Sequence, residues 1–537
     1  MVENNFETAR GSSGRIREKR ALEGKINVAR EGIFIKQPLT RMAEDQIELV
    51  HQASMAILRD PGLICFNKRA ADIFSSNGAE VSSLPDADHP TWIIKIPESL
   101  VLEALDTAPK TVKLGARNED NALILDGEKP SVYFITGSET NIWLDVDFPT
   151  YVKKSDPNKE VQVPEFTAKR GTVADLCKSA HVCELLDSVD GYIRTVNIQD
   201  SDITEENKDV NKYFASLNNT TKHVMAGLTS LSQLDNVVNM ARIIVGGDQQ
   251  LKDNPIISFI TCLVKSPLQF VDDTTETFIE VCKRGLPVVV SSAPQAGSTA
   301  PIKEVGILVQ INAEVLAGIT LGQLVNPGTP VIYGSVPVRA RMDTLNDSYG
   351  AVETSQYNVD CVQLARYYKI PNYSTSGVCD PKIPGQQSSI ERLFSDLLVT
   401  LSGPQYLHCA FGLLDCNSVF CLPQAVLDDA HFNMLRFFLR EPRIDVDEIA
   451  DVVKQIKDVT ATPQKIFISY IRKIMRSGQL SPPYPFEGDG EGDNVFKLAC
   501  EKTEELLATP VPHIDEITSA KIFREIPGML PRLNVYA

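Results

Sequence analysis

Residues 311–335 read INAEVLAGITLGQLVNPGTPVIYGS and hold the end of a long apolar helix followed by a short apolar strand. The helix pattern begins near Val305 and stops at Asn326-Pro327-Gly328, where glycine and proline are typical helix stop signals. The segment TPVIYGSVP that follows is rich in β-branched residues, as expected of a strand covered on both faces. This stretch therefore predicts one helix-strand unit of an α/β protein.

The same alternation extends from this unit in both directions. Seven apolar runs with strand character alternate with helix-like stretches: GYIRTVNI, HVMAGLTS, IISFITCLV, LPVVVSSAP, TPVIYGSVP, IPNYSTSG and QYLHCAFGL. An eighth strand is expected near Val419 to Pro423. Seven or eight units over about 260 residues favour a closed (β/α)8 TIM barrel over an open doubly wound sheet. No GxGxxG follows any of these strands, which argues against a Rossmann domain.

The regions flanking this alternation have different patterns. A helical period begins at Leu39, and mixed turns and short strands follow it. After Gln424 the chain has a mostly helical pattern. The predicted organisation is a polar N-terminal arm (1–35), an N-terminal α+β region packed on the barrel (36–168), the TIM barrel (169–423) and a C-terminal helical region (424–537).

The bulk composition limits the classes of partner. A net charge of −17 argues against nucleic acids and anionic membranes, because both require clustered Lys and Arg. No stretch approaches the roughly 20 apolar residues that span a bilayer, and the N-terminus has no apolar signal core. We therefore expect a cytoplasmic protein, and the large size and basic arm suggest a homo-oligomer.

The chain has eleven cysteines without a CxxC pair, which indicates reduced and mostly buried thiols. The spacing His181-x-Cys183 is the one that resembles a metal site. Since the pair lies in a helical pattern, packing of that helix is the favoured interpretation and no metal is expected.

The active site of a TIM barrel lies at the carboxyl ends of its strands, in the loops that follow them. This rule, with the resemblance described below, selects the predicted substrate-binding residues: Gln295, Tyr333, Arg341, Glu353, Tyr357, Gly377, Asp380, His408 and Phe411. Aromatic faces there bind quaternary ammonium through the ring quadrupole, or else they pack the barrel. His408 likewise has two interpretations: it contacts a ligand, or it is a hydrogen-bonded residue of the side-chain layers inside the barrel. Glu353 and Asp380 either hold a cation or cap a helix.

Residues 311–335 closely resemble a signature of the trimethylamine:corrinoid methyltransferase superfamily. The segments GTVADL, CLVKSPLQF, APQAGSTAP, QLARYYKIP and GVCDPKIPGQQ follow the order of that family around it. The chain contains only standard residues, so it resembles the branch that lacks pyrrolysine, which is glycine betaine methyltransferase-like. The resemblance runs from about Leu39 to the C-terminus.

This resemblance implies a methyltransferase that moves a methyl group from a betaine-type quaternary amine to the Co(I) of a corrinoid protein. It implies no tightly bound cofactor, because the cobalamin is carried by the partner. No catalytic acid or base is assigned, since a quaternary nitrogen is already a cationic leaving group. Proximity and orientation then supply most of the catalysis.

The chain departs from the family pattern where the substrate is bound. RARMDTLNDSYG stands where an Asp-x-Arg-Thr-Gly-like run is common, with Arg341 and Asp343 in roughly its charged positions. Glu353, Asp380 and Lys382 match the family, whereas Gly385 does not. Either Arg339 or Arg341 pairs with a substrate carboxylate or lies at the surface. The alternatives are a folate- or pterin-dependent or other-donor methyltransferase on the same barrel, and a non-catalytic betaine-binding barrel.

Overall fold

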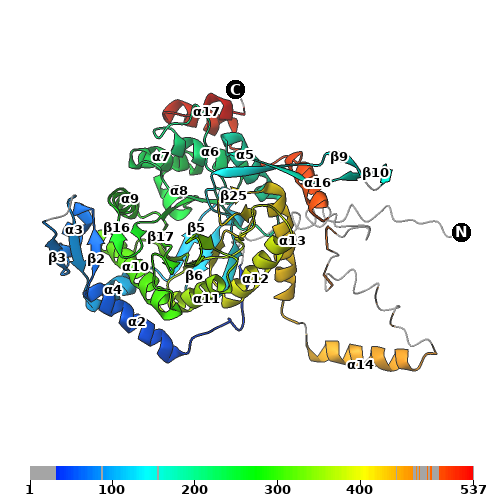
Figure 1. The fold of residues 1–537 in the computed structure, drawn as a ribbon, viewed down its shortest axis with the longest axis horizontal. Helices are drawn as coiled ribbons and strands as arrows, with labels where there is room; N and C mark the ends of the chain where they lie inside the picture. The colour runs from blue at the N-terminus through cyan, green and yellow to red at the C-terminus, as the bar shows by residue number, and fades with distance from the viewer. Residues whose placement is uncertain are drawn as a thin grey trace.

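The computed structural model describes residues 32–85, 89–153, 156–442, 444–463, 467, 471, 480–481, 484–486 and 495–535. Most of the predicted N-terminal arm lies outside these residues, so that arm stays a prediction. Figure 1 shows one large α/β body, with a small N-terminal unit beside it and C-terminal helices around it.

In the described chain the largest sheet has nine strands, in the order β1-β7-β23-β22-β19-β17-β14-β13-β12. The strands from β7 to β12 are parallel, and β1 (Ile33–Phe34) pairs antiparallel with β7. The parallel strands are β7 (Ser131–Phe134), β12 (Gly191–Ile193), β13 (His223–Ala226), β14 (Ile257–Thr261), β17 (Val288–Ser292), β19 (Val331–Ser335), β22 (Asn372–Thr375) and β23 (Tyr406–His408). All seven strands predicted from the sequence are confirmed.

The large sheet curls, so that its two ends approach each other (Figure 1). Isolated parallel bridges join Ile135, just after β7, to Gly191 of β12, and Thr140 to Val196. The Thr136 hydroxyl adds hydrogen bonds to the backbone of Ile193 across the same seam.

The expected eighth strand near Val419 to Pro423 is wrong as a member of this sheet. Val419–Phe420 forms β25, which pairs with β24 (Leu413–Leu414) and β8 (Ile142–Asp147) in a separate sheet that also holds β11 (Glu165–Arg170). The place beside β23 belongs to β7. The sequence pattern missed β7 because β8 to β11 separate it from the next helix, which interrupts the strand-helix alternation. The predicted division into regions stays a prediction, although this strand comes from the segment assigned to the N-terminal region.

Helices cover the outer face of the large sheet (Figure 1). The helix stop expected at Asn326-Pro327-Gly328 is confirmed, because the helix before it ends at Val325 and Gly328 has a left-handed φ of 84°. The helices are α5 (Val173–Leu185), α6 (Lys208–Asn219), α7 (Leu234–Val245), α8 (Asp248–Asp253), α9 (Asp272–Lys283), α10 (Glu304–Val325), α11 (Val352–Tyr367), α12 (Gln386–Ser402) and α13 (Leu422–Phe438).

Helix α10 is apolar on all sides because other elements surround it. By length and composition it would suffice to cross a membrane, contrary to the expectation that no such stretch exists, and 89% of its apolar window is buried. It packs against β17 and β19 on one side and against α2 (Glu44–Arg59) and α4 (Glu98–Thr107) on the other. This burial is typical of the core helix of a large domain.

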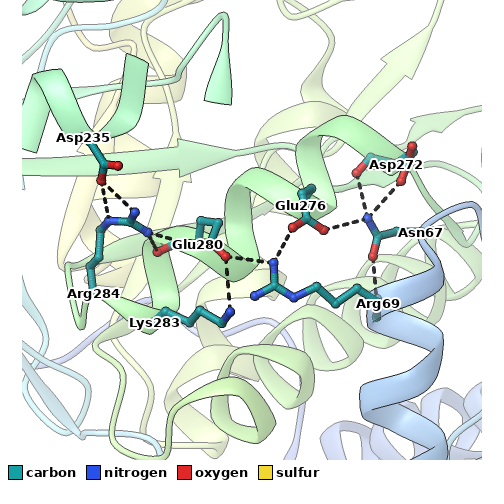
Figure 2. A network of polar contacts seen from close by, with 9 residues as sticks. Asn67, Arg69, Asp235, Asp272, Glu276, Glu280, Lys283 and Arg284 are labelled. Atoms are coloured by element: carbon teal, nitrogen blue, oxygen red, sulfur yellow. Dashed lines mark hydrogen bonds and ion pairs between the residues drawn. The ribbon is translucent and has the colours of Figure 1, made fainter. Parts of the chain in front are cut away.

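The small N-terminal unit shares a five-stranded sheet with the loop after β14. Its order is β15-β16-β2-β4-β3, with β15 (Val264–Lys265), β16 (Gln269–Phe270), β2 (Leu63–Cys65), β4 (Trp92–Lys95) and β3 (Glu80–Ser83). Helix α3 (Lys68–Ser76) is fastened to α9 by the network in Figure 2, in which Asn67 contacts Asp272, and Arg69 contacts Glu276 and Glu280.

A hairpin of β5 (Thr111–Leu114) and β6 (Leu123–Asp126) covers the amino ends of the parallel strands. Gly115 donates to the carbonyl of Pro255, just before β14, and Asn118 donates to that of Thr221, just before β13. Hairpin residues share a core with inner-face residues of the sheet: Val112, Leu114, Leu123, Leu125, Tyr133, Ile135, Ile193, Met225, Val289, Ile332, Tyr373 and Tyr406. The amino end of the sheet is therefore closed by apolar packing.

The C-terminal region predicted over residues 424–537 is helical where it is described. It contains most of α13, followed by α14 (Val446–Thr460), α16 (Val495–Leu507) and α17 (Glu516–Glu525). Helix α16 packs on α5 and α13, and α17 packs on α7. The remaining strands form a hairpin, β9 (Thr150–Lys153) with β10 (Asp156–Gln162), and a small sheet of β18 (Gln295–Ala296), β20 (Val338–Ala340) and β21 (Asp347–Ser348).

Candidate active site

Polar side chains from several parallel strands gather at the carboxyl end of the large sheet. In parallel strands these ends lie at one edge, which is where ligands bind in α/β proteins. We name this group the strand-end cluster: Glu139, Arg194, Cys262, Ser291, Tyr373 and His408.

The centre of the cluster is an ion pair between the segment after β7 and the residue after β12. Arg194 Nη2 lies 2.6 Å from Glu139 Oε2, and these side chains are 11% and 21% exposed. Lys212 of α6 lies 3.9 Å from the other Glu139 oxygen and 2.8 Å from Asp209. Although burial opposes it, the charges of Arg194 and Lys212 lower the pKa of Glu139 to about 2. Glu139 is therefore an anion throughout the working range of pH.

The ion pair leaves two polar atoms unused. Within the described chain, Glu139 Oε1 and Arg194 Nε have no hydrogen-bond partner. Polar atoms in the interior of a protein are nearly always paired, so an unpaired acceptor beside an unpaired donor indicates a place for a polar ligand. A ligand that offers both a positive and a negative group complements this arrangement.

Cys262 and Ser291 extend the cluster along the edge. Cys262 follows β14 and is accessible to solvent. The protein around its thiol raises the pKa, while the hydrogen bond with Ser291 and the charge of Arg194 act in the opposite direction. The Cys262 side chain is consequently a neutral thiol at pH 7.

His408 and Tyr373 form the opposite part of the cluster. Their ring centroids are 3.8 Å apart, and His408 Nδ1 lies 2.7 Å from the carbonyl oxygen of Ser374. Because a carbonyl only accepts, Nδ1 carries the proton. Burial lowers the pKa of His408 to about 3, so the ring is neutral. The geometry is that of a hydrogen-bonded layer residue, and a ligand contact for His408 stays a prediction.

Gln295 and Asp380 are brought together by β21. Gln295 Nε2 donates to Asp347 Oδ1 at 2.7 Å, and the Ser348 hydroxyl donates to Asp380 Oδ2 at 2.7 Å. Asp380 Oδ1 also accepts from the backbone of Gly350 at 2.9 Å. These contacts fasten the loops after β17, β19 and β22 to one another.

The two predicted arginines are paired close to their own loop. Arg341 and Asp343 form an exposed ion pair at 3.0 Å, and Arg339 lies 3.3 Å from Glu353 at the start of α11. Tyr357 of α11 is buried in a small apolar group with Ala296, Ala300 and Ile307. Arg339, Arg341, Glu353 and Tyr357 are therefore not among the six residues of the strand-end cluster.

The contacts of Tyr333, Phe411 and Gly377 are explained by packing and by backbone conformation. The Tyr333 hydroxyl donates to Asn312 of α10 at 3.0 Å, on the outer side of β19, and Phe411 packs on Phe432 of α13. Gly377 has φ 72°, and a Cβ atom there would lie 2.9 Å from Ala410 Cα, so glycine is required. Their predicted binding roles have no supporting contact and stay predictions.

The sequence interpretation missed Glu139, Arg194 and Cys262. Arg194 and Cys262 lie in the strand runs GYIRTVNI and IISFITCLV, where one charged or nucleophilic residue near the end of an apolar strand was the available signal. Glu139 had no such signal, because its strand was assigned to the N-terminal region.

One buried acid, Glu314, fixes two segments around the strand-end cluster through hydrogen bonds. Glu314 of α10 accepts from Ser266 Oγ at 2.8 Å and from the backbone of Leu268 at 2.9 Å, and it also contacts Ser292 and Gln310. Burial raises the pKa of Glu314, against these hydrogen bonds. The Cys262–Leu268 loop and the end of β17 are therefore fixed by one side chain.

His181 of α5 points to the C-terminal segment. Its Nε2 lies 2.8 Å from the carbonyl oxygen of Thr509, and Cys183 is fully buried. In the part of the chain that the structure describes, no group of three or more His, Cys, Asp and Glu side chains is arranged to hold a metal ion.

Comparison with known proteins finds one family along most of the chain. A family model described as trimethylamine methyltransferase (MTTB) matches residues 9–469. The chain is 30% identical to trimethylamine methyltransferase MttB of Desulfitobacterium hafniense over 419 residues, covering 78% of this chain and 79% of the relative. It is 26% identical to the glycine betaine methyltransferase of Desulfitobacterium hafniense over 426 residues, covering 77% and 81%. It is 28% identical to trimethylamine methyltransferase MttB of Methanosarcina barkeri over 507 residues, covering 92% and 95%.

Proposed function

The chain belongs to the trimethylamine methyltransferase family, and we propose that it moves a methyl group from a betaine-type quaternary amine to the Co(I) of a corrinoid protein. The observation that carries the substrate class is that the ion pair of Glu139 and Arg194 keeps one buried acceptor, Glu139 Oε1, and one buried donor, Arg194 Nε, without a hydrogen-bond partner in the described chain. A betaine is a zwitterion, and its two charges lie a few bonds apart.

In this proposal the curled sheet is a closed (β/α)8 TIM barrel. The bridges from Ile135 to Gly191 and from Thr140 to Val196 support closure between β7 and β12. The eight parallel strands and the helices outside them fit the same architecture. The strand-end cluster then lies at the mouth where barrels of this type hold their ligands.

Arg194 binds the substrate carboxylate, and Glu139 attracts its quaternary ammonium group. A quaternary nitrogen donates no hydrogen bond, so its recognition rests on charge and shape. Glu139 suits this role because the positive charges of Arg194 and Lys212 lower its pKa and keep it ionised. The low dielectric of a partly buried site strengthens both contacts.

The reaction asks little acid-base chemistry of the chain. When the methyl group leaves as a cation equivalent, the electron pair of the C–N bond stays on nitrogen and the product is a neutral tertiary amine. The corrinoid supplies the nucleophile that accepts the methyl group, and a separate protein carries it. The residues fit an acceptor that enters from outside, because Glu139, Arg194 and Cys262 keep solvent access while the β5–β6 hairpin covers the opposite end. The site holds the amine in line for transfer.

The first test mixes the purified protein with free cob(I)alamin and glycine betaine, proline betaine, carnitine, choline or trimethylamine. Methylation of the corrinoid is followed by its absorbance. We expect transfer from carboxylate-bearing quaternary amines and little from choline, which lacks the carboxylate. Transfer from trimethylamine alone would contradict the substrate class. No transfer from any amine, beside an active control enzyme, would favour another donor or a betaine-binding protein.

Variants locate the substrate site. Arg194→Gln is expected to raise KM for the active betaine at least about tenfold, because it removes a charged hydrogen-bond donor worth roughly 1.5–3 kcal/mol. The matched control is Arg341→Gln, which removes an exposed arginine paired with Asp343 and is expected to leave KM unchanged. The opposite ranking of the two variants would move the carboxylate site to the loop after β19.

A further inference from the structure

Helix α14 stands clear of the rest of the described chain (Figure 1). Five of its apolar side chains are exposed to solvent, whereas Val459 at its C-terminal end is buried: Val446, Ile449, Val452, Val453 and Ile456 are 82%, 54%, 45%, 44% and 46% exposed. A soluble protein rarely leaves so many large apolar side chains of one helix in water, and such a face marks an interaction surface. An isolated helix of 15 residues is also marginal in water, so α14 needs packing to be stable.

The exposed residues form one face of the helix. At 100° per residue, Ile449, Val452, Val453 and Ile456 fall within one apolar stripe, with spacings of three, one and three residues. This spacing is the same when the helix is followed in either direction. Because of this symmetry, the apolar side chains of two copies face each other when the helices pair antiparallel. Ile449 then lies level with Ile456 of the other copy.

The charges of α14 favour the same arrangement. Its N-terminal half carries Asp447, Glu448 and Asp451, and its C-terminal half carries Lys454, Lys457 and one acid, Asp458. With Ile449 level with Ile456 of the other copy, Glu448 lies level with Lys457 and Asp451 with Lys454, and these two attractive pairs outnumber the repulsive pair of Asp447 and Asp458. Parallel pairing would instead place acid beside acid and lysine beside lysine, which is unfavourable.

We propose that α14 is the contact through which two copies of this chain associate, antiparallel about a two-fold axis. Three apolar side chains near α14 in the chain are exposed as well: Ile444, and Met434 and Phe438 of α13, are 72%, 55% and 72% exposed. These residues enlarge the contact beyond one pair of helices. The partner is therefore a second copy of the chain, and the strand-end cluster takes no part in it.

The test measures the mass of the full-length protein in solution over a range of concentrations, by light scattering and sedimentation. We expect a concentration-dependent dimer in the wild type and half that mass in the double variant Ile449→Asp/Ile456→Asp. Both residues are exposed in the single chain, so its melting temperature should change little beyond the loss of the dimer. The matched control is Ile517→Asp on α17, an apolar residue 84% exposed on another helix, which should leave the mass unchanged.

Cross-linking then shows whether the two α14 helices pair antiparallel or parallel, and whether the partner is a second copy of the chain. In antiparallel pairing Val452→Cys lies next to its own counterpart and forms a disulfide-linked dimer under mild oxidation. Ile449→Cys alone does not, but it cross-links when mixed with Ile456→Cys. Self-linking of Ile449→Cys would establish parallel pairing and overturn the proposal. A wild type that stays monomeric, or a dimer that survives Ile449→Asp/Ile456→Asp, would also overturn it, and would leave α14 to another segment or another protein.

Discussion

At the scale of the residue, the interior of this protein selects protonation states by burial. His223 is fully buried, and its ring nitrogens lie 2.7 Å from the Gly115 carbonyl oxygen and 2.6 Å from Ser258 Oγ. Burial lowers the pKa of His223 to about 4, and that of His408 to about 3. Burial acts in the opposite direction on Asp396, where it raises the pKa to about 8. Such groups couple the stability of the fold to pH.

The histidines predict a loss of stability in mild acid. In the unfolded chain a histidine binds a proton below about pH 6.5, whereas native His223 stays neutral down to about pH 4. Each such histidine should therefore lower the free energy of unfolding by about 1.4 kcal/mol per pH unit as the pH drops through this window, while Asp396, whose raised pKa keeps it protonated in the native state, contributes in the opposite direction.

Denaturant unfolding at pH 6.5 and pH 4.5 checks this. His223→Asn should be less stable at pH 6.5, but its stability should fall less steeply than that of the wild type, with His408 present in both proteins. Equal slopes in the two proteins would show that His223 titrates normally in the native state.

At the scale of the element, α10 links the sheet to the loops of the strand-end cluster. It is surrounded by other elements, and Glu314 in its middle accepts hydrogen bonds from the segment after β14 and from the end of β17. One helix therefore holds two segments that border the strand-end cluster. We regard Glu314 as a positioning residue.

Glu314→Gln tests that role. The amide presents a donor where the carboxylate accepted, so we expect a loss of about 1–3 kcal/mol in the free energy of unfolding. The displaced loops should also lower kcat for methyl transfer, even at temperatures where the variant is fully folded. Glu304→Gln, at the exposed start of the same helix, is the control and should change both quantities little. A Glu314→Gln enzyme with lost stability and normal kcat would limit Glu314 to a structural role.

At the scale of the whole molecule, the large sheet draws strands from both sides of the predicted boundary at residue 169. β7 contributes residues 131–134 beside β23, isolated bridges join the chain just after β7 to β12 and Val196, and the β5–β6 hairpin fills the amino end of the same core. The small N-terminal unit is joined to the rest through the five-stranded sheet and through the ion-pair network in Figure 2. Cooperative unfolding of the large sheet therefore requires residues from about 110 onward.

A fragment of residues 169–423 should not fold on its own. Without β7 it has an open seam beside β23 and an uncovered inner core, so we expect no cooperative thermal transition and a weak near-ultraviolet circular dichroism signal. The control fragment, residues 32–537, retains both elements and should unfold cooperatively. Cooperative unfolding of the shorter fragment would show that residues 169–423 form an independent domain.

The sequence by itself determined the parts of this protein that depend on local periodicity. The helix and strand of residues 311–335, the helix stop at Asn326-Pro327-Gly328 and the six other predicted strands follow from neighbouring residues along the chain. Family membership also followed, because the signature is contiguous. Backbone geometry imposes these periods, so a linear pattern is enough to read them.

Only the tertiary structure decided which distant residues meet. Glu139 and Arg194 are 55 positions apart and pair because isolated bridges bring the chain after β7 next to β12, a contact that no local pattern predicts. The structure likewise turned Tyr333 toward α10, since adjacent residues of a strand point to opposite faces and the chain order does not say which face is inner. The physical reason is the same in both cases: burial and pairing are set by contacts between segments, and these exist only once the sheet has curled.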